Sequence, residues 1–585
     1  MAKKALLILI CFAVTLSFAN ITKAGEIRKV PIEIADAMTT RSDAPVDLSN
    51  RLWIPYQRDD ITDSPGIIVG LTYYDYQTNG STGSRVIHHE CGEHMCWMNR
   101  TSPNSDRLIY YNFIDDTGVP QFGETGTPIS EGPRDGYTTM DVMHNGRAAI
   151  TYHDAETQGE YRTLVAIDAD CGLGIFTIEE APHVFPGDSN YIWPYIAVDH
   201  RENIQITNNE SISTGGVASG IAHTFKEEPF WSPLVKYSTE QTISPMVVAS
   251  PVDDKVALVW NHVIAPEQNT QHNNDVVYIQ SQDGVNWDYQ NIINITNYQV
   301  DDTLRSYADV DAVYDFNGNL HIVWNAKGYW EESGTVTVDA CFLYHWSEAT
   351  GINMVYDAWH TSYPGTWNLS ASKPSVAVDE DGNLFVLFTR FDEFDVSNSV
   401  FSNGELYLCY STDGGITWAD SNLTETNTEG CFAGDCESEH WSSMEEHVLD
   451  HTLRIMYIED KDAGGGVLND PEGAITENPV RYLEVQVPTS VKEDDNIPGV
   501  FTLNQNYPNP FNSSTEIVYS LERPLNVKLS VYNVLGELVG VIDEGRKTAG
   551  EHTVRWDAPD NSSGVYFYQL SAGGSSFTKR MVLMK

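Results

Sequence analysis

Hydrophobic and polar residues alternate in short blocks along this chain, and the clearest block covers residues 373–418. Its β-branched and aromatic residues predict three strands, at 376–378, 384–389 and 406–410, and a fourth that begins near Trp418. An Asp-Gly-Asn turn separates the first two strands. We interpret the block as one four-stranded antiparallel unit.

The same order of elements recurs elsewhere in the sequence. A strand, a turn with Asp or Gly, and a second apolar strand begin at Thr138, Pro194, Pro245, Ala308 and Ser442, and a less regular unit spans 65–113. One such unit cannot bury both of its faces, so we expect the units to close into a ring. The pattern predicts an all-β propeller of six or seven blades within residues 25–487. An array of β-sandwiches is the competing arrangement.

The octet Ser411–Trp418 reads SxDxGxTW. Side-chain oxygens of Ser411 and Asp413 can accept hydrogen bonds from nearby backbone N–H groups, and Gly414 and Gly415 allow the positive φ angles of a tight turn. We therefore expect a structural hairpin with Trp418 packed beneath it, rather than a catalytic carboxylate. The octet resembles the Asp box of sialidase-like β-propellers at its fixed positions, Ser411, Asp413, Gly415, Thr417 and Trp418.

Shorter copies of the octet follow other predicted strand pairs, at Ser281–Trp287, Ser347–Met354 and Asp168–Ile175. Their positions are those expected of third-to-fourth turns in four-stranded blades. The resemblance to sialidases stops at the fold, because that family carries an early Arg-Ile-Pro motif and this chain has only RLWIP from Arg51. We carry over no catalytic residue from that family.

Strand order also predicts which loops form a ligand face. In a four-stranded blade the first-to-second and third-to-fourth turns share one face, while loops that enter a blade or follow its second strand share the other. Aromatic rings on this second face could stack on sugars, and arginines could hold acidic or hydroxyl groups. The candidate ligand contacts are Arg134, Trp193, Arg305, Tyr307, Trp330, Arg390, Asp392 and Trp441.

The residues after this predicted propeller change in character. Residues 488–499 are polar with two prolines, as expected of a linker, and residues 500–585 predict a small immunoglobulin-like β-sandwich. This last stretch resembles the C-terminal sorting domain of cargo for the bacterial type IX secretion system. That resemblance implies the secretion machinery as a partner. Its motif comprises Tyr507, Pro508, Asn509, Pro510, Phe511 and Asn512.

The first 24 residues read as a signal peptide. Lys3 and Lys4 precede the apolar run 6–14, and small residues follow at Ala19 and Ala24. No later segment is long and apolar enough to span a bilayer, so we expect no transmembrane segment in the mature chain. Together with the sorting domain, this predicts passage through the periplasm to the outer-membrane surface or the medium.

Charge excludes one class of partner. The chain holds 34 Lys and Arg against 83 Asp and Glu, a formal net charge of -49. Such a surface repels nucleic acid, which we exclude as a partner. Residues 500–585 carry eight acidic and eight basic side chains, so the excess lies entirely in the preceding part. The acidity is compatible with calcium sites, but a solvated coat explains it more simply, and we expect no cofactor.

Eight cysteines include Cys11 in the signal peptide, which leaves an odd number in the mature chain. Export favours disulfides, and the equal spacing of two pairs predicts bonds between Cys91 and Cys96 and between Cys431 and Cys436. The first pair lies in HHECGEHMC, where His88, His89 and His94 offer a zinc site as the alternative. We favour the disulfide, because oxidation outside the cytoplasm competes for the thiols.

Two functions fit these features. A secreted propeller that binds glycan or protein ligands needs only the exposed ligand face. An exo-acting, sialidase-like glycoside hydrolase needs in addition two carboxyl groups roughly 5–10 Å apart across a sugar. Binding has fewer requirements, so we favour it over catalysis.

Overall fold

The computed structural model describes residues 63–78, 80–157, 160–182, 191–210, 220–238, 245–264, 273–299, 302–330, 335–365, 368–465, 472–487 and most of 501–583. The predicted signal peptide, the linker 488–499 and Arg51 lie outside the described residues. The chain divides into two compact units, the first ending at Val487 and the second beginning at Pro488.

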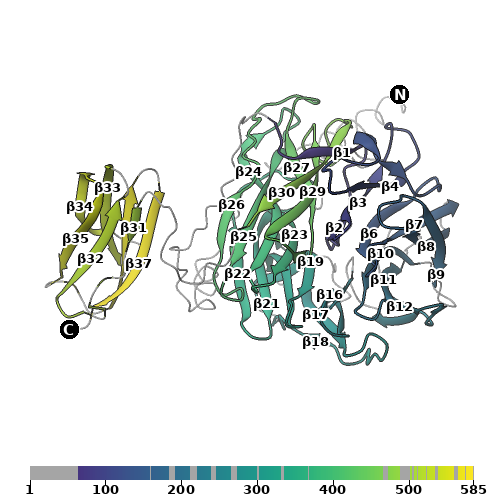
Figure 1. Ribbon diagram of the computed structural model, residues 1–585, viewed down its shortest axis with the longest axis horizontal. Coiled ribbons are helices and arrows are strands. Elements are labelled where there is room, and N and C mark those ends of the chain that lie inside the picture. Colours follow the sequence, from purple (N-terminus) through teal and green to yellow (C-terminus); the bar gives the residue numbers. More distant parts are fainter. Residues whose placement is uncertain are drawn as a thin grey trace, which may run out of the picture. The chain divides into compact units, whose positions relative to one another are not determined.

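The first unit consists of antiparallel sheets that follow one another along the chain (Figure 1). The first two are β2 (Val86–His89), β3 (Gly92–Asn99), β4 (Leu108–Ile114) and β5 (Thr127–Pro128), then β6 (Gly136–Val142), β7 (Ala148–Thr157), β8 (Glu160–Asp168) and β9 (Phe176–Ala181). The next holds β10 (Tyr191–Val198), β11 (Ile204–Glu210), β12 (Ile221–Glu227), β13 (Phe230–Trp231) and β14 (Val235–Ser238).

An eight-stranded sheet comprises two successive four-stranded sets joined through β17 and β19. These sets are β15 (Met246–Ala249), β16 (Val256–Val263), β17 (Asn274–Ser281) and β18 (Ile293–Asn294), and β19 (Leu304–Tyr314), β20 (Leu320–Trp330), β21 (Thr335–Ser347) and β22 (Gly351–Ala358). Then follow β23 (Ala371–Asp379), β24 (Leu384–Val396), β25 (Ser402–Ser411) and β26 (Ala419–Asn422), with β28 (His447–Val448) paired to β23. The last sheet holds β27 (Ser438–Met444), β29 (Thr452–Asp460), β30 (Asn478–Gln486) and β1 (Ile67–Thr72).

The first strands of these sets form a closed ring. In chain order each of β2, β6, β10, β15, β19, β23 and β27 contacts the next, and β27 returns to β2. β1 pairs antiparallel with β30, so the N-terminal strand completes the C-terminal sheet of the ring. The prediction of an all-β propeller is confirmed.

Neighbouring blades explain why the strands read as apolar runs. Every residue of β23 is buried, because this first strand has a sheet on each side. The outer strand β22 instead alternates between buried and exposed positions. The three strands predicted at 376–378, 384–389 and 406–410 lie within β23, β24 and β25, and β26 begins one residue after Trp418.

A segment without regular structure fills the centre of the ring. We call residues 73–85 the crossing segment; its described residues from 74 to 85 are all buried. Tyr195 on β10 donates a hydrogen bond to the carbonyl of Ser81 (2.5 Å), and Thr82 donates one to the carbonyl of Pro374 on β23 (2.9 Å). Arg85 donates to the carbonyl of Trp441 on β27 (2.6 Å). The crossing segment is therefore hydrogen-bonded to three first strands of the ring, β10, β23 and β27.

The cysteines require one correction. Cys91 is bonded to Cys171, between β8 and β9, and not to Cys96. Cys96 is a buried free thiol on β3, and extended chain at about 3.3 Å per residue puts it roughly 13 Å or more from Cys91, beyond the reach of a disulfide. Cys431 and Cys436 lie in a turn with their Cα atoms 5.1 Å apart and form a disulfide.

The second unit is a small sandwich of two antiparallel sheets around one hydrophobic core. One sheet holds β31 (Phe501–Leu503), β32 (Ser514–Leu521) and β35 (Gly550–Asp557), and the other holds β33 (Leu525–Asn533), β34 (Leu538–Lys547), β36 (Gly564–Ala572) and β37 (Ser575–Leu583). Within the predicted sorting motif, Phe511 is buried against Trp556, whereas Pro508, Asn509 and Asn512 are exposed. Tyr507 and Pro510 lie outside the described residues.

Candidate functional site

Hydrogen bonds between blades identify the face that carries the Asp-box turns. Arg201, in the turn between β10 and β11, donates to the backbone carbonyl of Asp283 in the turn after β17. Gln205 Nε2 donates to the carbonyl of Gly284 in the same turn (3.0 Å). First-to-second and third-to-fourth turns thus share one face, and the loops that follow second strands lie on the other.

The octet itself is a closed hydrogen-bonded turn. Asp413 accepts bonds from the backbone N–H groups of Ile416 (3.1 Å) and Thr417 (2.9 Å) and from the Ser411 hydroxyl (2.8 Å). Trp418 Nε1 donates to the carbonyl of Gly415 (3.0 Å), and its partly buried ring packs against the blade core. All of these hydrogen bonds to the Asp413 carboxylate come from residues of the turn itself.

Two predicted ligand contacts on β19 are buried. The Arg305 guanidinium, 1% exposed, donates to Asn273 Oδ1 (2.9 Å) and to the carbonyls of Asp302 (2.5 Å) and Gln299 (2.7 Å). Tyr307 is 5% exposed, and Lys327 Nζ lies 4.4 Å from the centre of its ring. These side chains hold loops and neighbouring strands together and do not face solvent, contrary to our expectation.

Trp441 is also buried, because the crossing segment covers the end of its strand. Its ring lies 4.4 Å from that of Tyr76, and Lys373 Nζ lies 5.4 Å above it. Lys373 in turn bonds Asp309 (2.6 Å), and both side chains are buried. The Trp441 ring is therefore part of the core of the propeller and is not exposed on the face where we expect ligand contacts.

Four first strands share a local distortion close to these residues. Tyr137, Trp193, Lys373 and Trp441 have φ between 51° and 55°, and each sits where the pairing with the second strand shifts register. Positive φ is uncommon for residues other than glycine and costs free energy. The same β-bulge occurs in all four strands, and a bulge bends the strand that carries it.

Arg134 and Trp193 lie beside a buried cluster around Arg107. The Arg107 guanidinium bonds the Tyr74 hydroxyl (3.0 Å), lies 5.2 Å from the ring of Tyr137, and contacts His153 Nε2 (3.4 Å). Burial, followed by the charge of Arg107, lowers the pKa of His153 well below its ordinary value, so the imidazole is neutral. Arg134 is exposed, and Trp193 is half-buried with its ring 6.0 Å from that of Tyr137.

Arg390 and Asp392 are the two predicted contacts that share a pocket. We call it the rim pocket. It lies at the C-terminal end of the second strand β24, on the face away from the Asp-box turns, and has a volume of about 260 Å³. Phe394 is 71% exposed beside it. The side chain of Trp330, the remaining candidate, lies outside the described residues. The rim pocket is lined by Arg390, Asp392, Phe394, Asp395, Asn403, Glu405, Tyr407, Asn422, Glu425 and Asn427.

Arg390 is held in a fixed position at this pocket. Its NH1 group donates to the Tyr407 hydroxyl (2.6 Å), its guanidinium lies 5.0 Å from the Tyr407 ring, and its NH2 group is 3.6 Å from Asp392 Oδ2. The Nε atom is buried and has no hydrogen-bond partner among the described residues. The Arg390 side chain as a whole is 27% exposed and lines the pocket.

Two neighbouring glutamates, one in the lining and one behind it, have raised pKa values. Burial raises the pKa of Glu405 to about 7 and that of Glu439 to about 8, and the neighbouring Glu405 adds to the second shift. The Thr426 hydroxyl lies 2.8 Å from Glu439 Oε2 and 3.4 Å from Glu405 Oε1. Glu439 is fully buried, whereas Glu405 is half-exposed and lines the pocket.

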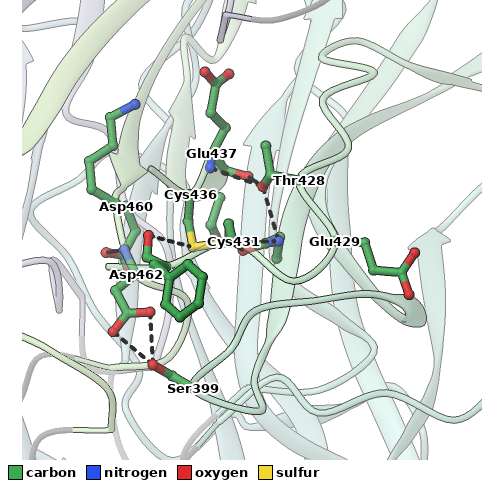
Figure 2. Close-up of a disulfide and its surroundings, with 12 residues drawn as sticks. Ser399, Thr428, Glu429, Cys431, Cys436, Glu437, Asp460 and Asp462 are labelled. Atoms are coloured by element: carbon green, nitrogen blue, oxygen red, sulfur yellow. Dashed lines mark hydrogen bonds between the residues drawn. A yellow bond between two sulfur atoms is a disulfide. The ribbon is translucent and has the colours of Figure 1, made fainter. Parts of the chain in front are cut away.

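The Cys431–Cys436 disulfide closes the loop that borders the rim pocket (Figure 2). Thr428 in this loop accepts a hydrogen bond from the backbone N–H of Glu437 (3.2 Å), and Asn403 Nδ2 donates to Thr428 Oγ1 (3.1 Å). Ser399 bonds both carboxylate oxygens of Asp462 (3.0 Å each) on the other side of the disulfide. The loop is thereby fixed against β25, which supplies lining residues.

A larger pocket of about 570 Å³ lies on the Asp-box face, between the sheets that begin with β6 and β10. Its one lysine is paired within the lining, because Lys226 contacts Glu179 (2.7 Å) and Glu228 (2.8 Å). The rim pocket differs because an aromatic side chain, Phe394, is exposed beside it. We therefore take the rim pocket as the candidate ligand site.

Sequence reasoning found Arg390 and Asp392 but missed Phe394, Asn403 and Glu405. The available signal was the polar and aromatic run that continues beyond Arg390, because β24 extends to Val396 and carries Asp392 and Phe394 to the pocket. Asn403 and Glu405 lie on the paired strand β25, and only the register places them opposite.

Comparisons with known proteins found one family match and several similar solved structures. Residues 505–584 match the family described as the secretion system C-terminal sorting domain. No curated protein matches the sequence. Similar solved structures include the polysaccharide lyase Uly1 (11% identity over 75% of this chain and 94% of that one, TM-score 0.42) and the β-propeller domain of the trilobed protease from Pyrococcus furiosus (10%, 73% and 97%, 0.36). An α-L-arabinofuranosidase from Fusarium graminearum is also similar (12%, 56% and 94%, 0.33). These identities and scores say nothing about activity.

The family match settles the role of the second unit. It is a type IX sorting domain, and the chain is exported to the cell surface or secreted. Within the part of the chain that the structure describes, no helix has the length and apolar character to cross a membrane.

Proposed function

We propose that the propeller of this exported protein binds a glycan in the rim pocket. The observation that carries the proposal is the exposed Phe394 ring beside a pocket whose polar lining is otherwise held in place. Sugar rings present apolar C–H faces and many hydroxyl groups, so a site needs an aromatic surface next to fixed donors and acceptors. Asn403, Asn422 and Asn427 supply both, and the partly exposed Arg390 guanidinium adds a charged contact.

Charge at the pocket narrows the class of sugar. Its lining contains four carboxyl groups, Asp392, Asp395, Glu405 and Glu425, against the single guanidinium of Arg390. Anionic sugars such as sialic or uronic acids would be repelled at neutral pH. We therefore propose a neutral or amino-bearing sugar, which is a different specificity from that of a sialidase.

A glycan array on the mature protein, followed by titration calorimetry with a bound glycan, tests this function. Phe394→Ala and Asp392→Asn should each weaken affinity about fivefold or more, because they remove a stacking surface and a charged acceptor. Phe230→Ala is the matched control, since this phenylalanine is 77% exposed on the distant strand β13. Unchanged affinity of both pocket variants, or an equal loss in the control, would refute the site.

Hydrolysis at the same pocket is the second candidate function. Glu405 keeps its proton up to a pKa of about 7 and lines the pocket together with Asp392, so an acid and a carboxylate are present side by side in one lining. Release of chromophore from neutral glycosides should then fall as pH rises through 7, and Glu405→Gln should abolish it while glycan binding persists. Absence of turnover on a broad glycoside panel, with binding intact, would leave binding as the function.

A further inference from the structure

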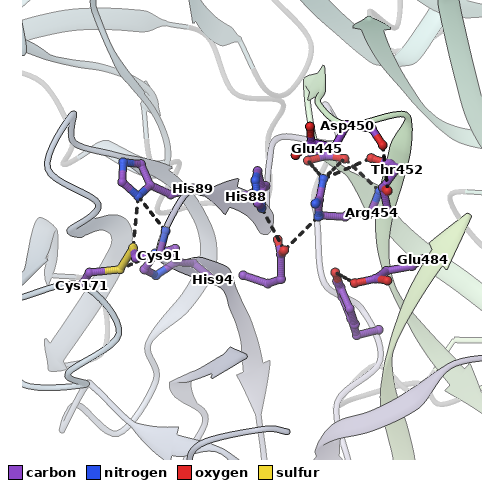
Figure 3. A network of polar contacts seen from close by, with 12 residues as sticks. His88, His89, Cys91, His94, Cys171, Glu445, Asp450, Thr452, Arg454 and Glu484 are labelled. Carbon is purple, nitrogen blue, oxygen red and sulfur yellow. Dashed lines mark hydrogen bonds and ion pairs between the residues drawn. A yellow bond between two sulfur atoms is a disulfide. The ribbon is translucent and has the colours of Figure 1, made fainter. Parts of the chain in front are cut away.

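A group of histidine and cysteine side chains lies between two blades, far along the chain from the rim pocket. His89 ends β2, Cys91 lies in the turn between β2 and β3, His94 lies on β3, and Cys171 lies in the loop between β8 and β9. Figure 3 shows the four side chains gathered at one place, with the two sulfur atoms bonded. The ligand atoms of His89, Cys91 and Cys171 all lie within 4.8 Å of one another.

Two nitrogen-to-sulfur distances, one for each imidazole, are close to those of a tetrahedral metal site. His89 Nδ1 is 3.1 Å from Cys91 Sγ, and His94 Nε2 is 3.7 Å from Cys171 Sγ. Zinc bonds of about 2.3 Å to sulfur and 2.0–2.1 Å to nitrogen place the nitrogen and sulfur ligands of a tetrahedron about 3.5 Å apart. Each imidazole therefore already stands at ligand separation from one sulfur.

A second contact orients the His94 ring. Its Nδ1 atom is 2.7 Å from the hydroxyl of Tyr111, which is fully buried, and the ring of Phe113 lies 4.9 Å away. When Nδ1–H donates to Tyr111, the lone pair is on Nε2 and points at Cys171. A hydrogen bond from the far nitrogen is the usual support of a metal-binding histidine.

Backbone of the neighbouring blade closes the group. Gly146, with φ of +81°, leaves so little room that a Cβ there would lie 2.7 Å from both Cys91 Sγ and His89 Nδ1. The turn that contains Gly146 joins β6 and β7, so the group is bounded by residues of two blades. His88, by contrast, is engaged elsewhere, because its Nδ1 bonds Glu93 Oε1 (2.8 Å).

We propose that His89, Cys91, His94 and Cys171 form a zinc site in the reduced protein. The Cys91–Cys171 disulfide is then the metal-free, oxidised state of the same two sulfurs. Binding of Zn²⁺ by the two thiols releases two protons. In the reverse direction the two thiolates lose two electrons to a disulfide oxidant, the S–S bond forms, the oxidant is reduced to two thiols, and the zinc ion leaves. Either state joins the same two blades.

The test uses the mature chain prepared with a phosphine reductant without oxygen, and in parallel after oxidation. We expect one equivalent of tightly bound zinc in the reduced protein by elemental analysis and none in the oxidised protein. Cobalt in place of zinc should give the intense visible bands of a tetrahedral thiolate site. A reduced protein with both thiols titratable but no zinc bound at micromolar concentration would overturn the proposal.

Variants distinguish a metal site from a disulfide alone. His94→Gln and His89→Gln should each abolish the cobalt bands, and Tyr111→Phe should weaken zinc affinity about tenfold. The half-buried residue His89 keeps the test valid if the His94 variant does not fold. His88→Gln is the matched control and should bind zinc as the parent does. Zinc affinity equal to the parent in the His89 and His94 variants would overturn the assignment of these ligands.

Discussion

Asp413→Ala removes the acceptor around which the Ser411–Trp418 turn is organised. The carboxylate accepts two backbone N–H bonds, from Ile416 and Thr417, and two hydroxyl bonds, from Ser411 and Thr417. Each such bond contributes about 0.5–1.5 kcal/mol net, but Asp413 is exposed and water can replace part of what is lost. We expect the free energy of unfolding to fall by about 1–2 kcal/mol, or the melting temperature of this large unit by roughly 2 °C.

The loss should depend on pH. Partial burial raises the pKa of Asp413, but hydrogen bonds from Thr417, Ser411 and Ile416 outweigh it and leave the pKa below its usual value of 3.8. A carboxyl group with a lowered pKa stabilises the folded state above the pKa of the unfolded chain, and this contribution disappears as pH falls through the folded value. The difference between the parent and Asp413→Ala should therefore be full at pH 7 and shrink below about pH 4.

Urea unfolding at several pH values, with glycan affinity measured in parallel, is the assay. Asp413→Asn keeps one acceptor oxygen and should lose less than the alanine variant. Thr412→Ala is the matched control, since Thr412 is exposed in the same turn and no side-chain hydrogen bond of it occurs among the described residues. An alanine variant that unfolds like the parent but no longer binds would refute both the structural role of the turn and its placement away from the ligand site.

Two further predictions concern buried side chains. Trp441→Ala should lower the free energy of unfolding by about 3–5 kcal/mol in urea titrations, because its ring fills the core against Tyr76; lost glycan affinity with unchanged unfolding would contradict this. Burial raises the pKa of Glu439 to about 8, so the folded protein keeps a proton that the unfolded chain releases near pH 4.5, and stability should decline as pH rises between these values. Glu439→Gln should remove this decline and melt higher than the parent at pH 8; parallel melting curves of the two proteins from pH 4.5 to 8.5 would exclude the effect.

The sequence alone determined those features whose causes are local. Strands β23, β24 and β25 follow from runs of β-branched and aromatic residues, and the turn at Ser411–Trp418 follows from side chains that bond backbone groups two to four residues away. The sorting domain can likewise be identified from the sequence, since its motif is contiguous and residues 505–584 match the family of secretion system C-terminal sorting domains. Each of these features depends on residues that are close together in the sequence, so no distant part of the chain is needed to predict it.

Tertiary structure decided which side chains are accessible and which are partners. Strand order predicts Trp441 and Arg305 in loops on the ligand face, yet they lie on β27 and β19 and are buried, because the crossing segment and neighbouring loops cover them. Cys91 bonds a cysteine 80 residues away rather than the one five residues along its own hairpin, since an extended strand carries Cys96 out of reach. Burial and pairing depend on surfaces brought together from distant parts of the chain, and no local pattern encodes which surface arrives.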